Sequence, residues 1–305
     1  MGNIRDATGV RTGFACSMLG QALRFDCADF EIGSLVCAGY GAAPYAAADV
    51  ASDLHYVIES SMADCRFRLS REGAPLVLAD HRSELLGALD RDLSVELQKR
   101  RPDLLFLHAA VLEWRGVAWV FVAPSGTGKS TLALALLSRG FRYMSDELAP
   151  IAVNGMCVHP YPRALCVKRP LPKDARRELP RDTIDLVDTL HLSARSLPTL
   201  SRHDQAPLGG VFVIARAARP ADAHTRRIGT AEAAISLYAN ALNALAHPNR
   251  GLDAVLDVAA RLPCFALAVA DLDAACRRVL HVVAQTRQQG RTNFYREQRA
   301  KPPMR

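Results

Sequence analysis

A glycine-rich loop between an apolar strand and a helix is the feature that most constrains the fold of this chain. The segment 116–124 (GVAWVFVAP) is apolar, and residues 123–130 read A-P-S-G-T-G-K-S before a helical run at 129–139. This order matches the phosphate-binding pattern G-x-x-x-x-G-K-[ST], except that Ala123 replaces the first glycine. A strand, a phosphate loop and a helix in succession are typical of an α/β sheet that binds its ligand at the strand ends. We therefore expect an α/β fold with a nucleotide site at this loop.

The loop keeps the residues that contact phosphate. Gly126 and Gly128 allow positive φ, so that successive backbone N–H groups can point inward. Lys129 is expected to reach the β and γ phosphates and Ser130 to place its hydroxyl on Mg²⁺. Ala123 can end the strand if its φ stays negative. The expected nucleotide-binding residues are Ser125, Gly126, Thr127, Gly128, Lys129, Ser130 and Thr131. The alternative is a glycine-rich turn without function.

Two adjacent acids follow the loop closely. Asp146 and Glu147 come after the strand-like segment 141–145, one short helix and one strand beyond Lys129. This spacing places them on the same sheet edge as the loop, where a carboxylate can hold Mg²⁺ or accept a proton from an attacking hydroxyl. The alternative is that Asp146 caps a turn and Glu147 is only exposed.

Four stretches carry a resemblance to a known family. H-A-A-V-L-E (108–113), A-P-S-G-T-G-K-S-T (123–131) and R-G-F-R-Y-M-S-D-E-L (139–148) resemble the catalytic domain of HPr kinase/phosphorylase. With Y-P-R-A-L-C-V-K-R (161–169), the sequence is more similar still to the HPr kinase-related kinase A family linked to exosortase and exopolysaccharide systems. The similarity covers roughly 104–170 and extends thinly to about 285.

The resemblance implies a fold shared with phosphoenolpyruvate carboxykinase and an ATP–Mg²⁺ phosphoryl transfer to a hydroxyl. It makes Asp146 the general base and Glu147 a metal ligand beside Ser130 and Asp146. His108 would lie near the phosphates, and Arg163 and Lys168 would neutralise transferring charge, as would Lys129. His108 can equally be a core histidine, and Arg163 can simply pin the hairpin.

Ala123 departs from the family pattern, and Arg169 stands where that family usually has Asn. No HPr-docking loop is recognisable at the C-terminal end. We therefore do not expect HPr itself to be the substrate.

Charge and composition exclude several classes of protein. The formal net charge is +7, but residues 287–305 contain six Arg or Lys and one Glu, which leaves a body near neutrality. We therefore expect no nucleic-acid partner, and a solvated basic tail. No apolar segment approaches the roughly 20 residues that cross a bilayer, so we expect no membrane insertion and a cytoplasmic address. The eight cysteines lack zinc-site spacing and are expected to be free thiols.

Three parts are expected along the chain. Residues 1–100 form a strand-rich N-terminal α+β region ending in a helix at 83–100, residues 101–286 form the P-loop domain, and 287–305 form a disordered basic tail. Within the middle part we expect paired strands at 104–114 and 116–124, a hairpin turning at Asn154-Gly155, and a mobile loop over 168–208. Helices at 231–246, 252–262 and 271–285 and strands at 209–217 and 263–270 complete it.

Three functions remain open at this point. The first is a kinase that uses ATP and Mg²⁺ to phosphorylate a hydroxyl of a protein serine or a small molecule. The second is a regulator in which ATP orders the 168–208 segment, and the third is a plain ATPase. The short distance from loop to acids argues against the large NTPase classes. The acceptor and the oligomeric state, with a homo-oligomer possible, are not decided by the sequence.

Overall fold

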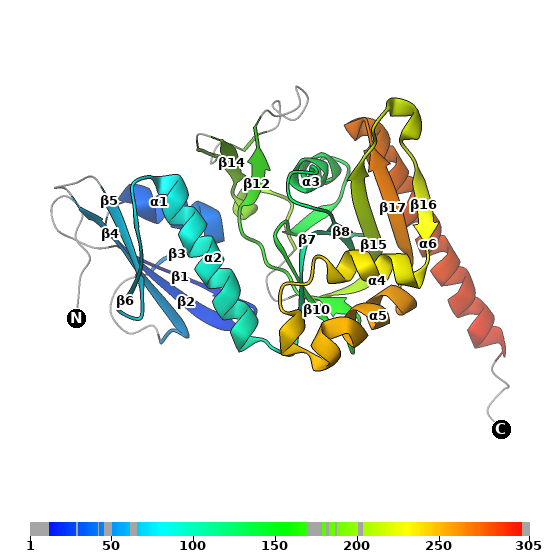
Figure 1. Cartoon of the computed structure of the whole chain (residues 1–305), viewed down its shortest axis with the longest axis horizontal. Helices are drawn as coiled ribbons and strands as arrows, with labels where there is room; N and C mark the ends of the chain where they lie inside the picture. The colour runs from blue at the N-terminus through cyan, green and yellow to red at the C-terminus, as the bar shows by residue number, and fades with distance from the viewer. Residues whose placement is uncertain are drawn as a thin grey trace.

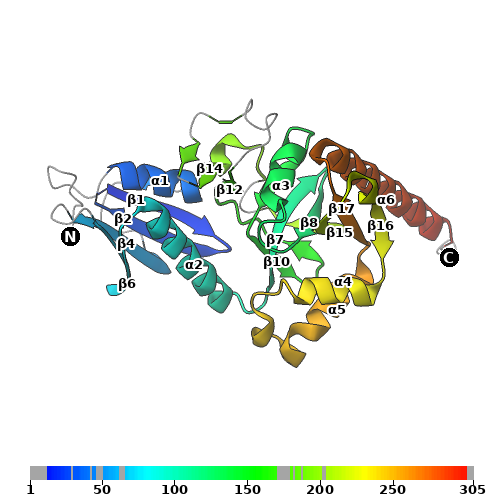
Figure 2. The same cartoon turned by 45° about the horizontal axis from the view of Figure 1, so that its top comes forward.

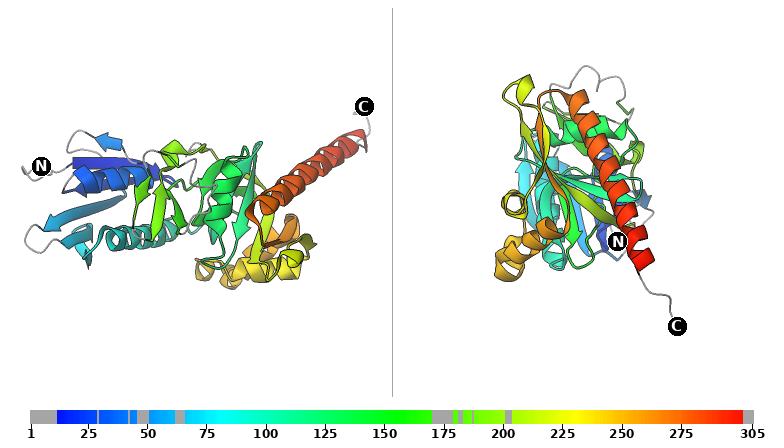
Figure 3. Two further views of the ribbon diagram at one scale, coloured as in Figure 1. Left: turned by 90° about the horizontal axis from the view of Figure 1, so that it is seen from above. Right: turned by 90° about the vertical axis from the view of Figure 1, so that its right-hand side faces the viewer.

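The chain folds into two regions that lie side by side (Figures 1 and 3). The computed structural model describes residues 12–28, 30–41, 43–45, 51–61, 66–169, 179–180, 183–186, 188–200 and 204–300. The N-terminal region occupies the left of Figure 1, and the C-terminal region, with the glycine-rich loop, occupies the right.

The N-terminal region is a six-stranded sheet with two helices. The strand order is β3-β1-β2-β4-β5-β6, antiparallel except for the parallel pair β2–β4. Two hairpins turn at Leu19-Gly20 and Glu72-Gly73, where both residues of each turn have the positive φ that a tight hairpin requires. The elements are β1 (Thr12–Met18), β2 (Gln21–Cys27), α1 (Phe30–Tyr40), β3 (Ala43–Tyr45), β4 (Leu54–Ser61), β5 (Arg66–Arg71), β6 (Ala74–Ala79) and α2 (Arg82–Arg100).

Leucines at helical spacing attach α2 to this sheet. Leu85, Leu89, Leu93 and Leu97 are fully buried and belong to a hydrophobic core that also contains Phe25 of β2. This core also takes in Phe106 of β7, Leu148 of β10 and Tyr161, so it continues into the C-terminal region. The expected helix at 83–100 is confirmed.

The C-terminal region is built on an eight-stranded sheet. The strand order is β11-β10-β7-β8-β15-β17-β16, with β9 paired to β7, and β11 also pairs with β15. Strands β8, β15 and β17 are parallel, so that their carboxyl ends share one edge of the sheet. The strands are β7 (Leu105–Trp114), β8 (Val117–Val122), β9 (Arg142–Ser145), β10 (Leu148–Ala152), β11 (Cys157–Val158), β15 (Ala206–Arg216), β16 (Thr225–Ile228) and β17 (Cys264–Val269).

Helices cover both faces of this sheet (Figure 2). Apolar residues of α4 (Thr230–Tyr238) and α5 (Leu252–Arg261) form a core with one face. Residues of α3 (Lys129–Leu137) and α6 (Leu272–Ala300) form a core with the other face. Short 3₁₀ turns lie at Ala194–Ser196, Pro220–Asp222, Ala244–Ala246 and Pro248–Gly251. None of the described helices is long and apolar enough to cross a membrane.

Most of the expected elements are confirmed. The α/β class is confirmed, as are the antiparallel pair β7–β8, the helix after the glycine-rich loop, and the β10–β11 hairpin around Asn154-Gly155. Five described cysteines are free thiols, namely Cys37, Cys157, Cys166, Cys264 and Cys276.

Three segments differ from expectation. The helix expected at 231–246 ends at Tyr238, and a 3₁₀ turn follows at Ala244–Ala246. Between them the Asn243 side chain bonds to the backbone of Leu104 and Phe106, which holds the chain against β7.

Within 168–208, expected to be a mobile loop, residues 170–178, 181–182, 187 and 201–203 lie outside the described part of the chain. Of the rest, β13 (Ile184–Asp185) and β14 (Thr189–Leu192) join β12 (Leu165–Lys168) in a three-stranded sheet. The reason is that apolar side chains occupy every second position of β12 and β14, and these leucines and the valine pack in the core beside α3. At the C-terminal end, α6 continues to Ala300 through most of the segment expected to be disordered. This segment is rich in Arg and Gln, which favour helix, and its first proline is Pro302.

Candidate functional site

The glycine-rich loop leaves the sheet at the carboxyl end of β8. Ala123 is buried in the core against α3 and does not adopt a positive φ, so it ends the strand as expected for a small residue. Gly126 and Gly128 have φ of 79° and 108°. A Cβ is strained at such angles, so the two glycines that the loop retains are the two that its backbone requires.

Lys129, the first residue of α3, reaches back across the loop. Its Nζ donates to the Ala123 carbonyl at 2.8 Å, and the side chain is buried. Burial lowers its pKa, as does the charge of Lys168, against the opposing effect of Glu147 and Asp146. The loop itself is tightened by Thr127, whose Oγ1 donates to the Pro124 carbonyl at 2.8 Å. The backbone of Ala123, the residue that replaces the usual first glycine, thus holds the amine of Lys129.

The two acids interrupt a strand that runs beside β7. Strands β9 and β10 both pair antiparallel with β7 in one direction, Ser145 opposite Val111 and Leu148 opposite His108. Asp146 and Glu147 lie in the break between them. The acids thus follow β9 as expected, but the chain continues directly after them into β10, which pairs with the same neighbour, β7. The interruption aims both side chains at the edge where the loop leaves β8.

Asp146 is buried at the centre of a set of donors. Its Oδ2 accepts from Ser130 Oγ at 3.2 Å and from the Cys166 backbone N–H at 3.0 Å, and its Oδ1 accepts from Tyr143 Oη at 3.0 Å. Arg163 Nε lies 3.6 Å from Oδ1. This carboxylate ties the first turn of α3 to β9 and β12, and its side chain is only 1% exposed.

Glu147 is the more accessible acid. Its side chain is 43% exposed, its Oε1 lies 3.7 Å from His108 Nε2, and its Oε2 lies 3.5 Å from Arg163 Nη2. Burial raises the pKa of Glu147, an effect that Arg163 opposes. Burial and the charge of Lys129 lower the pKa of His108, which favours a neutral imidazole. Because its Nε2 lies close to Glu147 and its side chain is partly exposed, His108 faces the acid pair and is not enclosed in the core.

Arg163 joins the site to the N-terminal region. Its guanidinium is buried and pairs with Asp90 of α2, which also accepts from Tyr40 of α1. The next backbone N–H, of Ala164, donates to the Gly39 carbonyl at 2.6 Å. Burial would lower the pKa of Arg163, but the three carboxylates of Asp90, Asp146 and Glu147 raise it well above its usual value.

The two basic residues after Arg163 take different positions. Lys168 is exposed at the end of β12 opposite Thr189, and it lies close enough to Lys129 for its charge to lower the pKa of that lysine. Arg169 pairs with Asp185 instead, so its guanidinium is engaged away from the acid pair.

Three residues of this cluster had no function assigned from the sequence. Arg216, at the carboxyl end of β15, donates from Nη2 to the Gly126 carbonyl at 3.2 Å, although it reads as a solvated strand end. The signal was a charged residue after a buried strand, but only the sheet order shows that β15 neighbours β8. Asp90 and Tyr143 carried no comparable signal, because their contacts depend on tertiary packing.

The arrangement suits a hydrated divalent cation rather than an all-protein metal cage. The described residues contain no cluster of three His, Cys, Asp or Glu side chains that could hold a metal ion. The Ser130 hydroxyl and the Asp146 carboxylate are nevertheless in contact at the loop. Mg²⁺ usually takes one or two carboxylates together with water and phosphate oxygens, so this donor set fits it.

Comparison with known proteins gives a partial match to one group. A 101-residue stretch is 35% identical to the HPr kinase/phosphorylase of Stenotrophomonas maltophilia (strain K279a), covering 31% of each chain. The HPr kinase/phosphorylase of Xanthomonas euvesicatoria pv. vesicatoria (strain 85-10) is 32% identical over 106 residues, 32% of each chain. The chain thus spans about a third of the length of the curated relatives that it matches. No protein-family model matches it.

A solved structure gives a weaker likeness. The HPr(Ser) kinase/phosphatase from Coxiella burnetii aligns with a TM-score of 0.35 and 12% identity, over 65% of this chain and 99% of that chain. The sequence similarity over about 100 residues relates this chain to HPr kinase/phosphorylases.

Proposed function

We propose that this chain is an ATP-dependent kinase that transfers the γ-phosphate to a hydroxyl, of a protein serine or of a small molecule. One observation carries the proposal. The Ser130 hydroxyl, in the first turn after the glycine-rich loop, lies 3.2 Å from the carboxylate of Asp146. Phosphoryl transfer needs phosphate-binding N–H groups, a cation site and a proton acceptor close together. The contact between Ser130 and Asp146 brings the end of the glycine-rich loop next to a carboxylate that can serve as cation ligand or proton acceptor. The similarity to HPr kinase/phosphorylases supports the same class.

We assign the nucleotide to the glycine-rich loop, in a P-loop sheet of the HPr kinase and phosphoenolpyruvate carboxykinase type. Backbone N–H groups of 125–131 would bind the phosphates, aided by the N-terminal end of α3. Lys129 would stabilise the charge on the β and γ phosphates. Arg216, already bonded to the loop at Gly126, adds a second cation on the opposite side of β8 from β7.

Ser130, Asp146 and Glu147 would hold Mg²⁺. Bound there, the ion would neutralise negative charge on the phosphates. Arg163 and His108 lie beside the same acids, and Arg163 and Lys168 would neutralise charge on the transferring phosphate.

We propose Asp146 as the group that accepts the proton of the acceptor hydroxyl. This assignment rests on the motif resemblance of 139–148 and on the contact of Asp146 with Ser130. The oxygens of Asp146 already accept three hydrogen bonds, however, and the side chain of Glu147 is 43% exposed and so easier for an acceptor to reach. Glu147 is therefore the alternative base, and substituting each acid separately distinguishes the two.

The wider setting remains part of the proposal. We propose a cytoplasmic enzyme, able to form a homo-oligomer and linked to exopolysaccharide production of the exosortase type. This setting rests on the motif resemblance of 108–113, 123–131, 139–148 and 161–169.

The test is a search for the phosphate acceptor. Purified protein is incubated with ATP–Mg²⁺ and either free serine or lysate proteins, and new phosphate is located by mass spectrometry, with Lys129→Ala as control. The proposal predicts label on one acceptor class and ATP consumption that depends on that acceptor. ATP hydrolysis without an acceptor indicates an ATPase instead. ATP binding without turnover under any condition indicates a regulator.

A further inference from the structure

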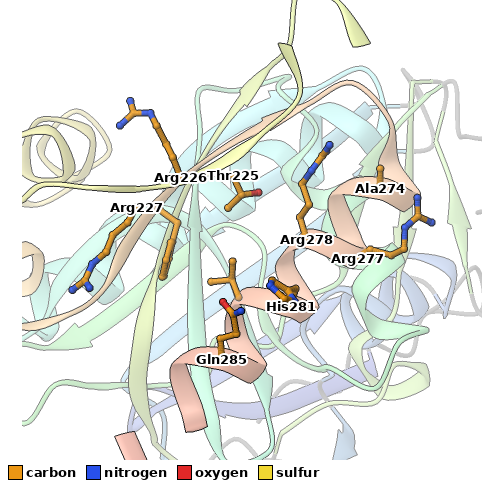
Figure 4. A pocket seen from close by; sticks show the side chains of 10 residues that line it. Thr225, Arg226, Arg227, Ala274, Arg277, Arg278, His281 and Gln285 are labelled. Carbon is orange, nitrogen blue, oxygen red and sulfur yellow. The ribbon is translucent and has the colours of Figure 1, made fainter. Parts of the chain in front are cut away.

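A second cavity lies at the far edge of the C-terminal sheet from the acid pair. It is an open groove with a volume of about 750 Å³, lined by edge strand β16, strand β17 and helix α6 (Figure 4). Strands β15 and β17 separate it from β8 and the glycine-rich loop in the sheet order. A volume of several hundred cubic ångströms is typical of a small-molecule site. We call this cavity the β16–α6 groove.

The β16–α6 groove is strongly basic. Four of its lining residues are arginines, His281 and Gln285 lie beside them, and none of its lining residues is acidic. Arg226 pairs with Glu232 and Arg277 with Asp273, so these two are neutralised at the rim. The remaining two, Arg227 and Arg278, form no ion pair with the residues that the structure describes. The groove therefore retains positive charge that can attract an anion.

Two polar atoms in this groove lack partners. Arg278 Nη1 and Thr225 Oγ1 are shielded from solvent and have no hydrogen-bond partner among the described residues. In Figure 4 their side chains lie between β16 and the start of α6. Buried donors are nearly always paired in folded proteins, and a guanidinium prefers an anionic oxygen. The two atoms thus indicate where an acceptor group would sit.

The lining also contains an apolar part. Phe265 of β17 and Val282 of α6 lie on the same cavity as the arginines. Guanidinium groups match the geometry of phosphate oxygens, and an aromatic ring or aliphatic chain gives contact to the rest of a ligand. We propose that the β16–α6 groove binds a small phosphate ester, with its phosphate on Arg278 and Thr225 and its organic part against Phe265.

The glycine-rich loop would also bind phosphate, so the test is made in the Lys129→Ala protein. Isothermal titration calorimetry without Mg²⁺ measures the binding of phenyl phosphate and of inorganic phosphate at low salt. We expect one site for phenyl phosphate, tighter than inorganic phosphate and weakened by added salt. No binding of phenyl phosphate at millimolar concentration, or equal affinity for the two probes, would overturn the proposal. This result does not depend on whether the proposed kinase activity exists.

Two variants locate the site. Gln285 is exposed on α6, so Gln285→Glu adds a negative charge to the groove at little risk to folding. We expect it, and Arg278→Ala, each to weaken phenyl phosphate binding about tenfold, the order of one charge-assisted contact. Arg91→Ala, an exposed arginine on α2, is the matched control and should bind like its parent. Unchanged affinity in both groove variants, with folding verified by circular dichroism, would contradict the assignment.

Discussion

The two regions of this chain use their charged side chains differently. In the N-terminal region, charges pair locally, as in the Arg71 contacts with Asp92 and Glu96 at the surface of α2. In the C-terminal region, Asp146, Glu147, Arg163 and Lys129 gather at the edge where β8 and β9 end. Charged side chains therefore converge on one place in the second region, as the proposed phosphoryl transfer requires, and are spread as separate pairs in the first.

Asp90 is the exception that links the regions. It lies on α2 of the N-terminal region, yet its carboxylate pairs with Arg163, which contacts both site acids. Buried charges are tolerated only when paired, so this arginine needs the N-terminal carboxylate. The N-terminal region therefore helps to position the site across the boundary between the regions.

The largest expected effect separates the regions by function. Lys129→Ala should reduce phosphoryl transfer by about 10²–10³-fold, because it removes a preorganised cation from the transferring phosphate. Lys99→Ala, a surface lysine of α2 paired only with Glu96, should leave the rate unchanged. Steady-state kinetics of the two variants measure this difference. An equal loss in both would show that the comparison between the regions is wrong.

The next effect tests the contact between the regions. Arg163→Ala leaves three carboxylates without their shared partner and should lower the free energy of unfolding by about 3–5 kcal/mol. Asp90→Asn removes one partner and should cost about 1–3 kcal/mol while weakening transfer. Urea unfolding measures both. If Asp90→Asn changes neither stability nor rate, the N-terminal region does not position the site.

A smaller effect is expected within α3. Ser130→Ala removes the hydroxyl that contacts Asp146 and should lower Mg²⁺-dependent transfer about 10-fold or more, on the scale of one lost charge-assisted contact. Its matched control is Ser138→Ala at the other end of the same helix, where the hydroxyl bonds only to the Ala135 carbonyl and to Arg139. The two variants should differ in their dependence on Mg²⁺ concentration and not in thermal stability.

The smallest effect concerns pH and the C-terminal region. Burial, and next the charge of Arg163, lower the pKa of His191. The unfolded state then binds the proton more readily, so this histidine's contribution to stability is present above about pH 6.5 and is lost as the pH falls through its depressed folded pKa. His191→Gln should flatten the fall in melting temperature below pH 6.5. An unchanged profile would show that His191 does not contribute to it.

Local sequence signals predicted the elements around the site. The apolar runs of β7 and β8, the glycines of the loop and the acids at 146 and 147 each carried a pattern of their own, and the structure brings them together. Asp90 had no such pattern, and the position of Arg216 after a buried strand did not assign it to the loop, because both contacts depend on which helix or strand packs there. The length of α6 was also missed, since a charged segment with good helix formers reads equally well as a tail.

The most direct test is transfer of ³²P from γ-labelled ATP by the wild type, Asp146→Asn and Glu147→Gln, with ATP binding measured in parallel. Asp146 contacts Ser130 at the loop, so Asp146→Asn should bind ATP yet lose at least about 100-fold in transfer, more than Glu147→Gln. A larger loss in Glu147→Gln would exchange the roles of the two acids. Transfer by Asp146→Asn and Glu147→Gln at the wild-type rate would contradict the assignment of this site to phosphoryl transfer.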